Sequence, residues 1–122
     1  IYIEVPNFHS VSSLIAGKAW AHFTPHFHTN HFTIRSFENY CAVKNVKHEI
    51  LGTYSFYNGI LGMSSAILSI FGYRGSIFED LKSKKLIIIF CLFAFLPISF
   101  LLELFSTIFL KRGSVIKILI YK

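Results

Sequence analysis

The 122-residue chain is 53% hydrophobic and 17% aromatic but only 15% charged, against roughly 25% charged residues in a typical soluble domain. With a mean hydropathy of +0.55, it is too apolar for a disordered chain and too small to hide this much apolar area inside a water-soluble globule. The net charge is +6, but most cations flank the two most apolar stretches, which indicates membrane borders and argues against nucleic-acid binding.

Residues 1–48 are expected to lie outside the bilayer. Residues 1–5 alternate like a short strand, and Ser10 can cap a helix over 10–23 that is too short to span and suits the interface. The His-rich stretch 20–32 has no Cys, Asp or Glu nearby, and Pro25 breaks its helical register, which favours aromatic packing on a partner over a metal site. Its weak candidates for metal ligands are His22, His26, His28 and His31.

Residues 50–72 carry no charge and are predicted to form a first membrane span. Small residues recur within it at intervals of three or four, which places them on one helical stripe. In lipid, such a stripe lets two helix backbones approach closely, so we expect it to pack against another helix. The stripe consists of Gly52, Ser55, Gly59, Gly62, Ala66 and Ser69.

Residues 86–110 are the most apolar part of the chain and predict a second span of roughly 37 Å. The short polar link 73–85 makes the two spans an antiparallel hairpin, so both termini lie on one side of the membrane. The count of nearby cations places that side in the cytoplasm or matrix. The tail 113–122 is expected to lie along the interface.

Glu103 is the charged residue of the second span, and an intramembrane carboxylate is rarely without a role. Polar residues at helical spacing surround it, and residues of the first span match it in depth. The predicted intramembrane polar site comprises Glu103, Ser99, Ser106, Thr107, Tyr57 and Asn58. Two interpretations stay open: a structural Glu that fixes helix pairing, or a carboxylate in a proton path or quinone pocket.

Two short motifs, Thr24-Pro25-His26-Phe27 and His48-Glu49-Ile50-Leu51-Gly52, resemble segments of one known family. They are similar to the Ser-Pro-His-Leu stretch and to the Ser-Ile-x-His-Arg-x-Thr-Gly motif that precede and open the first span in the cytochrome b membrane anchor of succinate dehydrogenase (complex II). The resemblance implies a quinone edge near His48 and Ser36. It does not imply haem, because neither predicted span contains a histidine.

The sequence thus predicts an all-α membrane protein: a two-helix transmembrane hairpin (49–122) after an irregular, aromatic and His-rich N-terminal segment (1–48). We expect a small, mainly structural subunit of a respiratory-chain or related complex in the mitochondrial inner membrane, with no cofactor of its own and with haem or quinone only as neighbours. Its partners would be other membrane subunits and phospholipids, including anionic lipid at the cationic flanks. Two alternatives stay open, an electron-transfer or proton-path subunit and a free-standing membrane regulatory or immunity protein. No motif indicates a self-contained enzyme.

Overall fold

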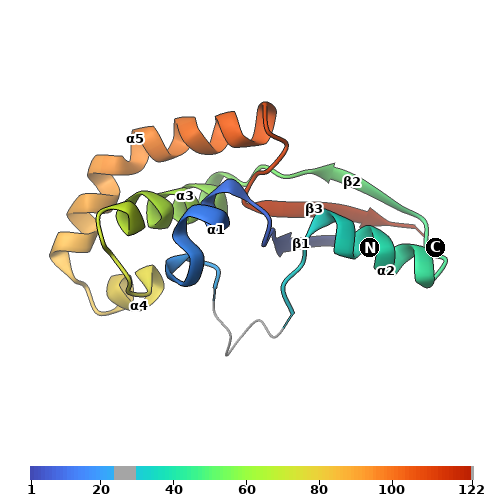
Figure 1. Cartoon of the computed structure of the whole chain (residues 1–122), viewed down its shortest axis with the longest axis horizontal. Helices are drawn as coiled ribbons and strands as arrows, with labels where there is room; N and C mark the ends of the chain where they lie inside the picture. The colour runs from blue at the N-terminus through green and yellow to red at the C-terminus, as the bar shows by residue number, and fades with distance from the viewer. Residues whose placement is uncertain (24–29, 122) are drawn as a thin grey trace.

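The structure is a computed structural model that describes residues 1–23 and 30–121. In these parts the chain forms a three-stranded antiparallel sheet at one end and a layer of packed helices at the other (Figure 1). The strands are β1 (Tyr2–Pro6), β2 (His48–Gly52) and β3 (Val115–Ile120), in the order β1-β3-β2. The helices are α1 (Val11–Ala16), the 3₁₀ turn η1 (Gly17–Ala19), α2 (Ile34–Val43), α3 (Phe56–Ile70), α4 (Ile77–Lys82) and α5 (Leu86–Ile108).

The sheet is held by a core on one of its faces. Alternate residues of a strand point to the same side, and in β3 these are Ile116, Ile118 and Ile120. Ile116 and Ile118 are fully buried and form a cluster with Phe37 and Cys41 of α2. The amphipathic helix α2 therefore covers this face, and the buried apolar side chains hold the three strands and α2 together.

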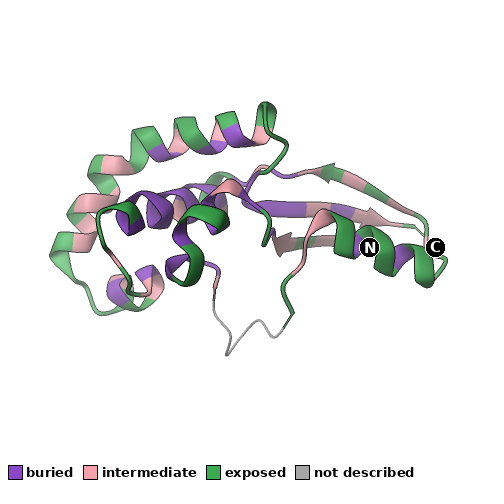
Figure 2. Cartoon of the chain, in the orientation of Figure 1, coloured by how far each residue is buried: buried purple, intermediate pink, exposed green. Residues whose placement is uncertain are grey.

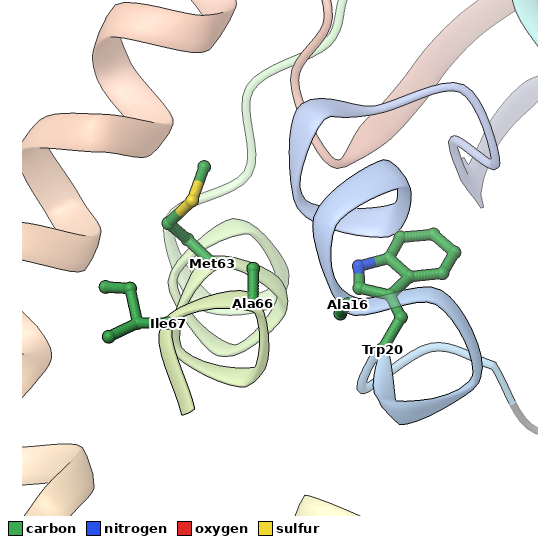
Figure 3. Packing of buried hydrophobic residues seen from close by; sticks show 5 residues of the cluster. All are labelled: Ala16, Trp20, Met63, Ala66 and Ile67. Carbon is green, nitrogen blue, oxygen red and sulfur yellow. The ribbon is translucent and has the colours of Figure 1, made fainter. Parts of the chain in front are cut away.

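A second core lies between α3 and the segment made by α1 and η1. Trp20 packs there with Ala16 from one side and Met63, Ala66 and Ile67 from the other (Figure 3). Small residues at Ala16 and Ala66 leave room for the indole ring. As a result α3 is buried over most of its length, as its colouring in Figure 2 shows.

The prediction of an all-α, two-helix transmembrane hairpin is wrong. The chain contains a sheet, and residues 50–52 belong to β2 instead of starting a helix. The alternating β-branched residues of β3, in the segment 113–122, fit a pleated sheet, and β3 becomes its central strand. Because α3 has 15 residues, its length is only about 22 Å, short of a hydrocarbon core of about 30 Å.

One helix within the described residues, α5, is long and apolar enough to cross a membrane. It does pack antiparallel to α3. The contacts run from Gly59 against Glu103, through the Ser64–Ser99 hydrogen bond, to the stacked rings of Phe71 and Phe95. The two helices therefore form a pair that projects from the sheet, with α4 at the turn between them.

Candidate functional site

Helix α5 has the opposite polarity from a helix on a soluble domain. Its buried residues are Ser99, Glu103 and Ser106, whereas Phe90 and Phe93 are 73% and 71% exposed. Figure 2 shows the exposed surface along both halves of the helix. A soluble domain buries the apolar stripe of such a helix and exposes its polar stripe, so this arrangement suits an apolar surrounding.

Pro97 interrupts the hydrogen-bond ladder of α5 near its middle. Proline has no N–H, so the carbonyl of Phe93 loses its usual partner four residues on, and the ring pushes the helix axis aside. Figure 1 shows the resulting bend, which lets α5 follow α3 in its second half while its first half turns toward α4.

The carboxyl group of Glu103 is fully buried and lies at the centre of a polar network. The backbone N–H of Ser114 donates to Glu103 Oε1 at 2.8 Å, and the Ser114 hydroxyl donates to Oε2 at 2.9 Å. Ser114 immediately precedes β3, so both oxygens of this carboxyl group tie α5 to the sheet.

The network continues from Ser114 to the N-terminal part of the chain. The hydroxyl groups of Ser114 and Ser12 are 2.8 Å apart, and Trp20 Nε1–H donates to Ser12 Oγ at 3.1 Å. Ser10 Oγ lies 3.1 Å from Ser12 Oγ and also caps α1 by accepting from the Ser13 N–H. One chain of hydrogen bonds thus joins α1, η1, α5 and the start of β3.

Two residues of the small-residue stripe give this network its space. A Cβ on Gly59 would lie 2.7 Å from both Cγ and Oε1 of Glu103. A Cβ on Gly62 would lie 3.0 Å from Trp20 Nε1 and 3.1 Å from Ser114 Oγ. Both glycines allow α3 to approach the network closely.

The other stripe residues lie at different places. Gly52 ends β2 and Ser55 is the residue before α3, so neither belongs to the helix. Ala66 faces Trp20, and the Ser69 hydroxyl donates to the backbone carbonyl of Ala66. Part of the stripe therefore packs against α1 and η1 of the same chain.

The remaining residues of the predicted polar site have separate surroundings. Ser99 accepts a hydrogen bond from Ser64 at 2.9 Å, and the Ser106 hydroxyl donates to the backbone carbonyl of Glu103. Thr107 Oγ1 is buried without a hydrogen-bond partner. Tyr57 is exposed, and the carbonyl of Asn58 lies 2.8 Å from His22 Nε2, away from Glu103.

The two described members of the predicted metal-ligand set, His22 and His31, lie against aromatic rings. His31 stacks on Phe8 and Phe23 at centroid distances of 4.7 and 5.3 Å, and the His22 ring meets Trp20 edge-on. Within residues 1–23 and 30–121, no three His, Cys, Asp or Glu side chains gather in a metal-binding group. His26 and His28 lie outside the described residues, as does the motif Thr24-Pro25-His26-Phe27.

His48 and Ser36, the two residues of the implied quinone edge, stand on different elements. His48 opens β2, where its ring packs near Phe37. The Ser36 hydroxyl takes part in a reciprocal capping box with Thr33 at the start of α2. This capping role accounts for Ser36 locally.

The geometry of the Glu103 network favours a structural role. A proton path needs groups that alternate between donor and acceptor and that reach water at both ends. Here Ser12, Ser114 and Glu103 have no exposed surface. The network therefore holds four elements in one arrangement and satisfies a carboxyl group that would otherwise be costly to bury.

Sequence reasoning did not find Ser114 as the partner of Glu103, or Ser12 and Trp20 as further members of its network. Ser12 and Ser114 are 102 positions apart, so no local spacing connects them. The only signal was Glu103 itself, which needs buried donors wherever it is placed.

Comparison with known proteins adds no relative. No protein-family model matches the chain. No match was found among curated proteins or among solved structures.

Proposed function

We propose that the chain is a membrane-anchoring module in which α5 inserts its apolar surface into a lipid bilayer. In this proposal, the sheet and α2 form a head outside the hydrocarbon region that contacts partner subunits. The observation that carries the proposal is the inverted polarity of α5, with Glu103 and two serines inside and large apolar side chains outside.

The transfer of the exposed side chains of α5 from water to lipid has a large favourable free energy. Ten large apolar side chains of α5 are exposed, each by between two-fifths and four-fifths of its surface. Moving each into lipid gains about 1 kcal/mol at this partial exposure, or of the order of 10 kcal/mol together. That gain is comparable to the whole free energy of unfolding of a small domain, about 5–15 kcal/mol, and it favours α5 in lipid over α5 in water. These side chains are Leu86, Ile87, Phe90, Phe93, Leu96, Ile98, Leu101, Leu102, Phe105 and Ile108.

The ends of α5 support membrane attachment in a second way. Lys84 and Lys85 precede the helix, and Lys111 and Arg112 follow it. Lysine and arginine at the ends of an apolar helix keep their charges in the headgroup region while their stems cover apolar surface. All four residues are exposed, and Lys85 also pairs with Asp80 of α4.

Site-directed spin labelling tests the proposal. A nitroxide at Phe90→Cys, in a chain without Cys41 and Cys91, is expected to collide with dissolved oxygen and to be shielded from a water-soluble nickel chelate in phosphatidylcholine vesicles. Val43→Cys is the matched control, because Val43 is apolar and 83% exposed but lies on α2. Equal access of the nickel chelate to both labels would overturn the proposal.

Placement in a mitochondrial respiratory complex stays a prediction from composition, and the complex II resemblance stays untested. Affinity purification of the full chain from mild detergent, followed by identification of co-purifying membrane subunits, tests both. A free-standing regulatory protein would instead elute as a lone 14.0 kDa chain with its detergent.

A further inference from the structure

A groove of about 680 Å³ lies beside the C-terminal end of α5. Its walls come from three places: the turn after α5, the first turn of α2 and the loop after β1. The ionisable side chains that line it are Arg35, Lys111, Arg112, His9 and Glu38, and Leu110 forms an apolar edge. We call this the α5–α2 groove.

The groove carries an excess of positive charge. Arg35, Lys111 and Arg112 contribute three cations against one carboxylate, Glu38, which leaves an excess of two positive charges. Across the described residues the single salt bridge is between Lys85 and Asp80, so no carboxylate pairs with these three cations. Cations in excess that form no ion pair favour an anionic ligand.

The local backbone directs these cations to one place. Lys111 has a φ of 54°, and the Arg112 N–H donates to the Ser106 carbonyl at 3.0 Å, so the chain turns sharply where α5 ends. Arg35 stands in the first turn of α2, a ten-residue helix whose positive dipole end adds to the field. The buried Asn7 side chain donates to the Gly113 carbonyl at 2.9 Å and fixes the loop after β1 against the same turn.

The groove also begins where the apolar surface of α5 ends. Phe109 is exposed and Leu110, the next residue, lines the groove. With α5 in the bilayer, a lipid that lies along the helix would place its acyl chains on this apolar surface and its headgroup beside Arg35 and Arg112. An arginine guanidinium can bind a phosphate through two parallel hydrogen bonds.

We propose that the α5–α2 groove binds the phosphate of an anionic phospholipid from the bilayer that holds α5. This inference rests on the proposed function, because it places the groove at the headgroup level. The proposed ligand is a phosphate group that is esterified to a lipid. A free anion in solution is a different ligand, and the test below separates the two.

The test compares co-flotation of the full chain with vesicles of phosphatidylcholine alone and with vesicles that also contain phosphatidic acid. The groove variant is Arg35→Gln with Arg112→Gln, and the control is Lys44→Gln with Lys47→Gln, which removes two exposed cations outside the groove. Two surface cations contribute up to about 30-fold in affinity for an anionic membrane. We expect the preference of the groove variant for anionic vesicles to fall at least about tenfold further than that of the control.

A second variant guards against misfolding of the first. Glu38→Gln removes the carboxylate of the groove and is expected to raise the preference for anionic vesicles severalfold. An equal loss in the groove and control variants, or no gain in Glu38→Gln, would overturn the groove as a specific site. Full competition by millimolar inorganic phosphate would overturn the lipid as its ligand. Failure of the unmodified chain to bind phosphatidylcholine vesicles would instead refute membrane anchoring by α5, so the two proposals fail in different ways.

Discussion

Replacement of Gly59 by Ala is the most direct test of how α3, α5 and Glu103 fit together. The new Cβ would lie 2.7 Å from Glu103 Cγ and Oε1, well inside the usual separation of about 3.5–4.0 Å between packed carbon atoms. The carboxyl group cannot simply withdraw, because the Ser114 N–H and hydroxyl hold both of its oxygens.

The size of the effect follows from two opposing terms. Overpacking a well-filled site costs about 1–3 kcal/mol. Alanine in a helix interior is favoured over glycine by about 1 kcal/mol. We therefore expect Gly59→Ala to lower the free energy of unfolding by about 0–2 kcal/mol in the native background. In a Glu103→Ala background, where the obstructing carboxyl group is gone, the same change should raise it by about 1 kcal/mol.

The difference between the two backgrounds is a coupling free energy of about 1–3 kcal/mol, which a double-mutant cycle measures. The four proteins can be unfolded in dodecyl maltoside micelles and followed by tryptophan fluorescence. Trp20 is the single tryptophan of the chain and donates to Ser12 within the same network, so it reports on this region directly. A coupling below about 0.5 kcal/mol would refute close packing of Gly59 on Glu103.

Two further predictions concern other parts of the fold. Asp80 pairs with Lys85 and accepts a hydrogen bond from the Tyr73 hydroxyl, and these contacts, Lys85 first, lower the pKa of the Asp80 carboxyl group. A lowered pKa stabilises the fold above about pH 4, and this contribution is lost as the pH falls through the lowered value. The native chain should therefore melt at a higher temperature than Asp80→Asn near neutral pH, and this difference should vanish in acid. A difference that does not change with pH would contradict this. Ile118→Ala should cost about 2–5 kcal/mol in chemical unfolding, because Ile118 is fully buried beneath α2, whereas the exposed Val43→Ala should stay within about 0.5 kcal/mol.

Local sequence patterns predicted α5 and its polar face. A helix follows from the unbroken apolar run, and the spacing of Ser99, Glu103 and Ser106 places these residues on one side of it. Since that face is also the least apolar part of the run, it is the part expected to turn away from lipid. The structure buries these three residues and leaves the opposite side exposed.

Local patterns did not predict the sheet. An apolar run next to lysines, such as residues 115–120, has the same composition as a membrane-border segment. Its pairing depends on β1, more than 100 residues earlier, through contacts such as Ile3 with Ile118 and Val5 with Ile116. Hydropathy averages ignore such partners. The end of β2 was therefore predicted as the start of the span 50–72, and β3 was predicted as part of the interfacial tail 113–122.

The sequence by itself determined that this chain carries an apolar helix with cationic ends and one buried-type carboxylate, because these properties depend on composition and on spacing within a single helix. Only the tertiary structure decided which groups satisfy that carboxylate, since Ser114 donates to it from the start of β3 and Ser12, 102 positions before Ser114, joins the network through the Ser114 hydroxyl. It also decided that residues 48–52 pair with 117–120, because a strand gains its hydrogen bonds from another strand and not from its own neighbours.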